Sequence, residues 1–294
     1  MSPAFVAFVN TVFVPVGLML IMFSLGLTLA LKDFALVATH PKTVIAGLAG
    51  QLVAMPLLAL ALGILFRLPP TMALGLFILG ICPAGTTSNA LTFLGRGNVA
   101  LAVVLTALSS FVTVFSIPLL LSWALPHFLG GGEAPKLSVV TTMVQLLRVA
   151  VLPIAVGMIV RRFAPDFAAR LARWLRPVSA IVLVAVIAFS VAISLDLVLL
   201  NVVRGGPALY ALNLAAMGAG LLIAKAIGAG AKDRMTLSIE VGVHNVTLAI
   251  YLTLTVLNDL PLAVLQNIYG VVMLLNAAFL IRGFRPAIAR EEQR

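Results

Sequence analysis

Glu240 is the residue of this 294-residue chain whose position makes the strongest chemical demand. It lies inside an apolar stretch, residues 235–257, which reads MTLSIEVGVHNVTLAIYLTLTVL and also holds His244 and Asn245. A carboxylate inside a membrane span costs about 3 kcal/mol unless it is paired or binds a cation. Three partners satisfy that demand: a bound monovalent metal ion, a proton taken up by the carboxyl group, or Arg148 from another apolar stretch.

A second apolar stretch, residues 75–97, carries a similar polar interruption. It reads GLFILGICPAGTTSNALTFLGRG, with Pro83 and Gly85 followed by hydroxyl and amide side chains at positions 86–89. Such a break is tolerated inside a span only where protein or a cavity surrounds it. By the count of spans between them, the two interrupted stretches cross the membrane in opposite directions. This pattern predicts an inverted-repeat secondary transporter with its site near the middle of the bilayer.

The two breaks together offer the ligands that a hard cation prefers. Side-chain oxygens come from Ser88, Asn89 and Glu240, and unwound backbone carbonyls are expected near Val241 and Val243. This inventory favours sodium over zinc or iron, because each break offers oxygen atoms and too few nitrogen or sulfur ligands.

Each break also starts a new helix, whose free N–H groups and dipole attract an anion. A carboxylate-bearing substrate is the natural ligand there; the alternative is that the threonines only hydrogen-bond to their own helices. Asn10 and Arg148 are further candidates because they are polar residues inside other spans. The candidate substrate-binding residues are Thr86, Thr87, Asn245, Val246, Thr247, Asn10 and Arg148.

Composition indicates an all-α membrane protein. Hydrophobic residues make up 62% of the chain and charged residues 10%, with a mean hydropathy of +1.19, which excludes a water-soluble globule. The single cysteine, Cys82, excludes an internal disulfide and a cysteine-based zinc site. No HExxH motif, paired intramembrane aspartates or serine with a partner base is present, so an enzyme is not expected.

The apolar runs predict nine transmembrane helices. Aligning the two breaks leaves four helices in the first half and five in the second, as though the first helix of the usual ten were missing. The arginine-rich segment 161–176 is expected to be a loop between the fifth and sixth spans. The expected spans are 5–31, 44–66, 71–94, 99–123, 138–160, 177–200, 206–230, 235–257 and 261–281.

The net charge of +10 does not indicate a nucleic-acid partner, because the distribution of the basic residues among the loops is explained by membrane topology. Fifteen of the 19 lysines and arginines fall in alternate loops, at one helix end and in the C-terminal tail. The positive-inside rule therefore predicts an outside N-terminus and a cytoplasmic C-terminus in the cell (inner) membrane. The segment 161–176 is either a topological anchor or a site for anionic lipid headgroups. The start lacks a basic region, so the first helix is expected to be retained.

At these residues the sequence resembles the bile acid:sodium symporter family. The resemblance rests on GLTLALKDF with THPK, on GQLVAMP, on CPAGTTSNALTFLGRGNVALAVVLTALSS and on IEVGVHNVTLAI, and it follows nearly the whole chain in order. It implies one transporter domain, with a core bundle at 44–123 and 206–281 and a panel at 5–31 and 138–200. The two broken helices would cross in the core, and substrate would bind between core and panel.

The resemblance also implies sodium ligands. One site would comprise Ser88, Asn89, Thr106 and Glu240, with Ala102 where the family has a serine. The other would comprise Gln51, Glu240, Val241, Val243 and His244, where His244 replaces the usual glutamine. Both replacements remove a side-chain oxygen, so one or two Na⁺ ions are expected. His244 either makes transport sensitive to pH or hydrogen-bonds to a neighbour.

The function that the resemblance implies is sodium-coupled import of an organic anion by alternating access. The low aromatic content of 7% favours a small carboxylate, such as a pantoate-like or keto acid, over a bile acid. A proton-coupled or an efflux carrier of the same fold is the alternative. No protein partner is expected.

Overall fold

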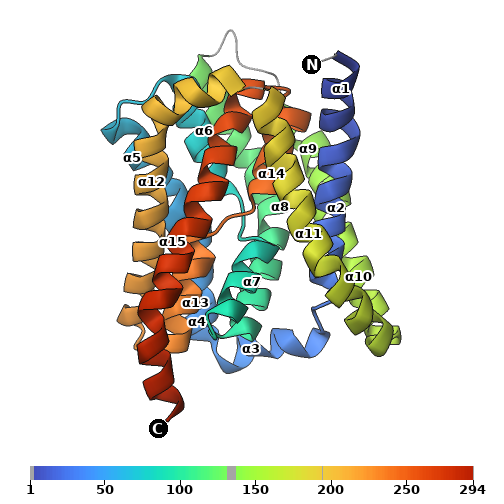
Figure 1. Cartoon of the computed structure of the whole chain (residues 1–294), viewed down its shortest axis with the longest axis vertical. Helices are drawn as coiled ribbons and strands as arrows, with labels where there is room; N and C mark the ends of the chain where they lie inside the picture. Colours follow the sequence, from blue (N-terminus) through green and yellow to red (C-terminus); the bar gives the residue numbers. More distant parts are fainter. Residues whose placement is uncertain (1–2, 131–136, 194, 294) are drawn as a thin grey trace.

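The computed structural model describes residues 3–130, 137–193 and 195–293, and every regular element in these ranges is a helix. Figure 1 shows the longer helices running roughly along the long axis of the molecule, with the two termini at opposite ends. The elements in chain order are α1 (Pro3–Phe8), η1 (Val9–Phe13), α2 (Val14–Gly26), η2 (Leu31–Phe34), α3 (Ala35–Thr39), α4 (Pro41–Ala49), η3 (Gly50–Ala54), α5 (Met55–Leu65), α6 (Pro70–Ile81), α7 (Thr86–Leu94), α8 (Val99–Leu129), α9 (Val139–Leu146), η4 (Leu147–Val151), α10 (Leu152–Phe163), α11 (Pro165–Ile193), α12 (Leu195–Ala226), α13 (Ala231–Gly242), α14 (Val246–Tyr251), η5 (Leu252–Val256) and α15 (Leu260–Glu292).

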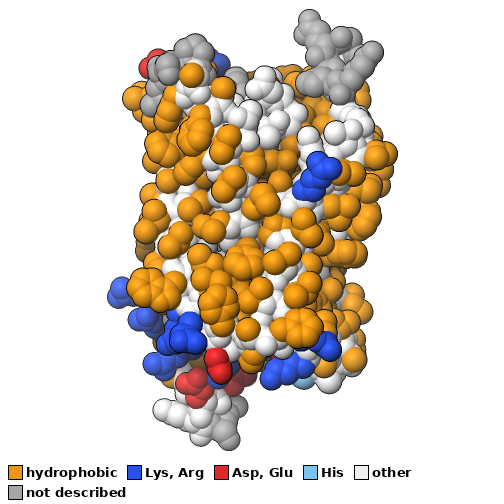
Figure 2. Space-filling view, turned by 90° about the vertical axis from the view of Figure 1, so that its right-hand side faces the viewer, with side chains coloured by type: hydrophobic (Ala, Val, Ile, Leu, Met, Phe, Trp, Pro, Cys, Tyr) orange, Lys and Arg blue, Asp and Glu red, His pale blue; other side chains and the backbone are white. Residues whose placement is uncertain are grey.

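The fold is that of a multi-pass membrane protein. Large apolar side chains on its outer face are exposed, among them Ile64, Phe163 and Phe279, as expected of residues that contact lipid. Figure 2 shows this apolar face, with lysine and arginine gathered mainly at the lower end, where the C-terminus lies. Within the described residues, seven helices are long and apolar enough to cross a membrane: Ala4–Gly26, Pro41–Leu65, Val99–Leu129, Val139–Phe163, Pro165–Ala192, Val202–Ala226 and Leu262–Glu292.

Two further apolar segments are interrupted where the sequence predicted breaks. α6 ends at Ile81 and α7 begins at Thr86, while α13 ends at Gly242 and α14 begins at Val246. Figure 1 shows the two non-helical links near mid-height of the molecule. The links pair with each other: Ala84 and His244 form an antiparallel bridge.

The expected loop at 161–176 is wrong, because this segment is helical. α10 ends at Phe163 and α11 begins at Pro165. Proline suits the first helical turn, where an N–H has no partner, and Asp166 in the same turn favours the helix dipole. The boundary expected between 200 and 206 is also wrong, since α11 ends at Ile193 and α12 runs from Leu195. Figure 1 shows α12 bending near its start, and Pro207 lies inside this helix.

Proline also explains three of the four π-helical turns in the described residues. Pro15, Pro56 and Pro153 each lie two residues after such a turn, namely after η1, η3 and η4. A proline ring clashes with the carbonyl four residues earlier, and a π turn accommodates this by shifting to an i→i+5 bond. In η3 the Met55 N–H donates to Gly50 O, five residues back. Gln51 lies inside this π turn.

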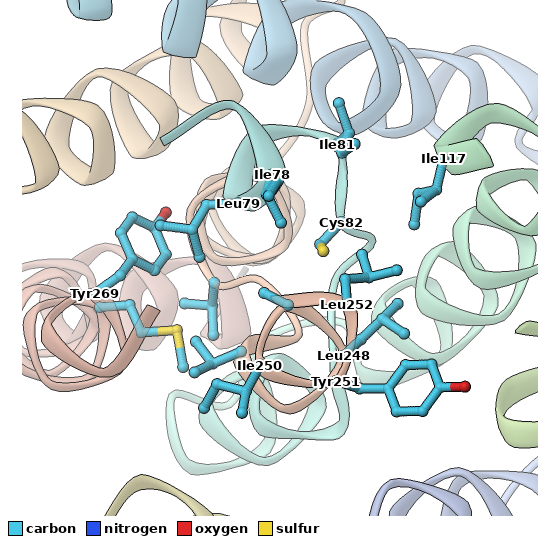
Figure 3. Packing of buried hydrophobic residues seen from close by; sticks show 14 of the residues in the cluster. Ile78, Leu79, Ile81, Cys82, Ile117, Leu248, Ile250, Tyr251, Leu252 and Tyr269 are labelled. Atoms are coloured by element: carbon cyan, nitrogen blue, oxygen red, sulfur yellow. The ribbon is translucent and has the colours of Figure 1, made fainter. Parts of the chain in front are cut away.

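Close packing holds the helices on either side of the links. α2 packs against α10 and α11, whereas α12 packs against α13 and α15. Figure 3 shows apolar side chains around the first link, including Ile78 and Leu79 of α6 and Leu248 of α14, with Cys82 at the start of the link. The links are thus enclosed by protein and not exposed to lipid.

Gly157 of α10 lies close against the backbone of α2, and we expect its replacement to be costly. A Cβ atom at this position would lie 2.6 Å from Phe23 O and 2.7 Å from Leu27 N. Gly157→Ala should therefore separate α2 from α10 and destabilise the protein by about 1–3 kcal/mol. Thermal unfolding of the detergent-purified protein measures the effect. Gly218→Ala in α12 is the control, because its Cβ would meet nothing within 4 Å; equal stability of both variants would contradict the prediction.

Candidate functional site

The two links are joined by hydrogen bonds between their backbones and side chains. The Asn245 N–H donates to Pro83 O at 2.8 Å, next to the Ala84–His244 bridge. The His244 ring also reaches the other link, with Nδ1 2.6 Å from Cys82 O. Because both links lose helical hydrogen bonds, each supplies partners for the other, and a fixed crossing results.

The crossing is lined by the polar side chains that the sequence predicted as cation ligands. Glu240 is fully buried, and its Oε2 accepts hydrogen bonds from Gln51 Nε2 and Thr106 Oγ1, both at 3.1 Å. Thr106 Oγ1 also lies 3.3 Å from Asn89 Oδ1, and the Ser88 hydroxyl adjoins the Glu240 carboxyl group. The structure thus brings together residues from η3, α7, α8 and α13.

Two oxygen atoms of this cluster have no donor. In the described part of the chain, Glu240 Oε1 and Gln51 Oε1 are buried without a hydrogen-bond partner. A buried carboxylate oxygen without a partner is unfavourable unless a cation or a proton satisfies it. These unpaired oxygen atoms, with the hydroxyl groups beside them, fit a small hard cation such as sodium.

Arg148 does not supply the missing charge. Its side chain is exposed on η4, and the ion pair found among the described residues joins Lys232 to Glu292 and does not involve Glu240. The same residues contain no group of three or more His, Cys, Asp or Glu side chains suited to a transition metal. Of the three partners predicted for Glu240, a monovalent cation and a proton remain.

The carbonyl groups at the end of α13 each contact a side-chain donor or a ring nitrogen. Glu240 O accepts from Gln51 Nε2 at 3.1 Å, and Val241 O lies 2.9 Å from His244 Nε2. Gly242 O accepts from Asn213 Nδ2 at 2.7 Å and from the Tyr269 hydroxyl at 2.9 Å. The last carbonyls of a helix have no partner in that helix, so these donors stabilise its end inside the bundle.

Asn245 presents a free donor beside the start of α14. Its Oδ1 accepts from Leu248 N–H at 3.0 Å, as a helix N-cap does, while its Nδ2 is buried without a partner. Ser110 Oγ on α8 is likewise buried and unpaired. Both residues line a cavity of about 10 Å³ that also borders Met22 and Ala150. The cavity is too small for an organic molecule, so the site is closed in this conformation.

The remaining candidate substrate residues fall into two groups. Thr86 and Thr87 lie half-buried in the first turn of α7, and Val246 and Thr247 lie buried in the first turn of α14. All four therefore adjoin the crossing. Asn10 lies on η1, where its backbone oxygen accepts from the Thr255 hydroxyl at 2.6 Å. Neither Asn10 nor Arg148 joins the polar cluster around Glu240.

Ser110, Asn213 and Tyr269 belong to the site but were not predicted from the sequence. Asn276 Nδ2 donates to Asn213 Oδ1 at 2.8 Å, which fixes the amide that caps α13. The asparagines inside two apolar spans, at positions 213 and 276, were an available signal, because polar residues in spans often pair with one another. Ser110 carried no comparable signal, since serine is common between membrane helices.

A helical membrane bundle whose two broken helices meet beside a buried carboxyl group has the architecture of a secondary transporter. Residues 15–201 match the model of a family described as the Sodium Bile acid symporter family. The chain belongs to this family, and it is a transporter and not an enzyme.

Similar proteins come from bacteria, plants and mammals. The chain is 31% identical to the "Uncharacterized sodium-dependent transporter YocS" of Bacillus subtilis (strain 168), over 79% of this chain and 71% of the relative. It is 30% identical to the "Probable sodium/metabolite cotransporter BASS1, chloroplastic" of Arabidopsis thaliana, over 81% of this chain and 58% of the relative. It is 32% identical to the "Hepatic sodium/bile acid cotransporter" of Rattus norvegicus, over 59% of this chain and 48% of the relative. The matches thus span about half to 70% of these relatives.

The cap on α13 gives a stability test of the crossing. Asn213→Leu removes the amide donor to Gly242 O and leaves the Asn276 amide without its acceptor. We expect a loss of about 1–3 kcal/mol in the free energy of unfolding, measured by thermal unfolding in detergent. Tyr269→Phe removes the other donor to Gly242 O and a long hydrogen bond, 3.3 Å, from Asn213 Nδ2, and it should cost less, about 1 kcal/mol, because the amide cap stays in place. A larger loss in Tyr269→Phe than in Asn213→Leu would contradict this arrangement.

Proposed function

We propose that this protein is a symporter that couples the inward movement of sodium to import of an organic anion. The observation that carries the proposal is the buried carboxyl group of Glu240, whose Oε1 has no donor and which has no cationic side chain beside it in the described structure. The printed names of the bacterial, plant and rat relatives, each a sodium-dependent transporter or a sodium cotransporter, support the choice of sodium.

The proposed sodium ligands are those that surround the two unpaired oxygen atoms. Glu240 supplies the formal negative charge, and Gln51 supplies its side-chain carbonyl. Ser88, Asn89 and Thr106 supply further oxygen atoms within reach of the carboxyl group. Because the ligands come from four separate helical segments, a bound ion holds η3, α7, α8 and α13 together.

The proposed substrate is an anion with a carboxylate group, such as a small keto or hydroxy acid. The binding test at the end of this subsection also includes bile acids. The unpaired Asn245 Nδ2 and Ser110 Oγ offer hydrogen-bond donors to a carboxylate beside the start of α14. Thr86, Thr87 and Thr247 lie near the same helix starts, whose dipoles favour negative charge. Substrate would therefore lie between the crossing and α2.

Alternating access requires the small cavity at Asn245 to open. Its walls come from α8 and α14 on one side and from α2, α9 and η4 on the other. We propose that the first group belongs to a core bundle, 44–123 with 206–281, and the second to a panel, 5–31 with 138–200. α2 packs against α10 and α11, which is consistent with a panel that moves as one unit. Movement of panel against core would open the cavity to one face of the membrane at a time.

The proposed topology has nine crossings. Seven continuous spans and two interrupted ones, α6 with α7 and α13 with α14, give this number within the described residues. An odd number agrees with termini at opposite ends of the molecule. The antiparallel pairing of Ala84 with His244 supports an inverted repeat. The basic residues at the lower end in Figure 2 favour a cytoplasmic C-terminus and an outside N-terminus in the cell membrane.

Glu240→Gln tests the sodium site. The variant keeps the shape of the side chain but removes the charge that binds the ion, so stabilisation by NaCl relative to KCl at equal ionic strength should disappear. In the unmodified protein that stabilisation should reach about 2.7 kcal/mol when sodium is about 100-fold above its Kd. Thermal unfolding in detergent measures both. Glu292→Gln is the control, because this carboxylate is partly exposed and pairs with Lys232 at 3.0 Å.

Two results decide between the proposal and its rival. Sodium-specific stabilisation that persists in Glu240→Gln would overturn the proposed site. No sodium effect in either protein would favour a proton as the partner of Glu240, and therefore a proton-coupled carrier.

Ser110→Ala tests the substrate site. It removes one proposed hydrogen bond to the carboxylate, so the Kd of a stabilising anion should rise about five-fold, corresponding to about 1 kcal/mol. Thermal shifts with a panel of small carboxylates and bile acids in NaCl identify such an anion and give its Kd. Ser122→Ala is the matched control on the same helix, because Ser122 is exposed and donates to Leu119 O. An unchanged Kd in Ser110→Ala would remove Ser110 from the site.

A further inference from the structure

His244 occupies the space between the two links with both of its ring nitrogens. The residue is 1% exposed, and Nδ1 lies 2.6 Å from Cys82 O while Nε2 lies 2.9 Å from Val241 O. The ring therefore spans from the end of α6 to the end of α13. Among the hydrogen bonds of the described crossing, no other side chain contacts both a carbonyl of the first link and a carbonyl at the end of α13.

The position of the ring matters because α13 ends there, and the last carbonyls of a helix are available to bind a cation. At this end the carbonyls of Glu240, Val241 and Gly242 each contact a side-chain donor or ring nitrogen. A hard cation requires several oxygen atoms, at about 2.3–2.6 Å in calcium sites. With Val241 O covered by the imidazole, the carbonyl of Val243 would be the main ligand left on this side.

We propose that the imidazole ring of His244 closes the cation position at the end of α13, so that this carrier binds one sodium ion per chain. The inference rests on the proposed function and concerns the number of ions at the same crossing. The ion is held by the two oxygen atoms that lack donors, Glu240 Oε1 and Gln51 Oε1, with the neighbouring hydroxyl groups. His244 takes the place of a second ion because its ring lies between the Cys82 and Val241 carbonyls, one of which can accept the single N–H of the neutral ring.

The consequence of the proposal is that a side chain with an amide oxygen at position 244 opens a second site. Glutamine in place of His244 presents a carbonyl oxygen and withdraws the ring from Val241 O. The carbonyls of Val241 and Val243 then join the new amide oxygen as ligands of a second ion, while Gln51 Oε1 stays with the first ion. The first site, around Ser88 and Thr106, is left unchanged.

The test is to count bound sodium directly. Equilibrium binding of radioactive ²²Na⁺ to the detergent-purified protein, with potassium as the competing salt, gives the number of ions per chain and the Hill coefficient. The expected result is one ion and a Hill coefficient near one for the unmodified protein, and two ions with a Hill coefficient above one for His244→Gln. His40→Gln is the matched control, because His40 is exposed and lies outside the crossing.

Each outcome bears on the proposal in a defined way. Two ions bound to the unmodified protein would overturn the single-ion inference and leave the proposed symport intact. One ion in both proteins would overturn the role given to His244. No saturable sodium binding to the unmodified protein would overturn both proposals. The count on the unmodified protein also decides the number of ions if His244→Gln does not fold.

Discussion

The buried carboxyl group of Glu240 is the feature on which the rest of the crossing depends. A carboxylate away from water must be satisfied by hydrogen bonds and by positive charge. Here Gln51 and Thr106 satisfy one oxygen of Glu240 and leave the other free. The fold thus brings three polar groups from separate helices to one point but leaves Glu240 Oε1 without a donor. A bound cation can offset the unfavourable free energy of this buried, unpaired oxygen.

The interrupted backbone imposes a second requirement at the same place. Carbonyl and N–H groups released by the breaks cannot face lipid, so they must pair inside the protein. The Asn245 N–H pairs with Pro83 O, and side chains of Asn213, Tyr269 and His244 contact the carbonyls at the end of α13. Because these partners come from both links and from α12 and α15, the crossing is a rigid centre. The conformational change of transport would therefore take place around it.

The sequence was sufficient to predict the breaks and much of the cluster. Glycine, proline and polar residues inside apolar runs locate both links, and a lone carboxylate in a span predicts converging oxygen ligands. The orientation of side chains after a π turn was harder to predict. A π turn adds one residue to a helical turn, which rotates the following positions relative to an α-helical pattern. Arg148 lies in such a turn and is exposed, although its place inside an apolar span made it a candidate partner of Glu240.

The central claim is that sodium contacts an ionised Glu240 carboxylate, and infrared difference spectroscopy tests it most directly. Spectra of the lipid-reconstituted protein are recorded while KCl is exchanged for NaCl at constant ionic strength. The account predicts a sodium-induced shift of a carboxylate stretching band that is present in the unmodified protein and absent in Glu240→Gln. A carboxylate band that does not respond to sodium, or a response that persists in Glu240→Gln, would contradict it.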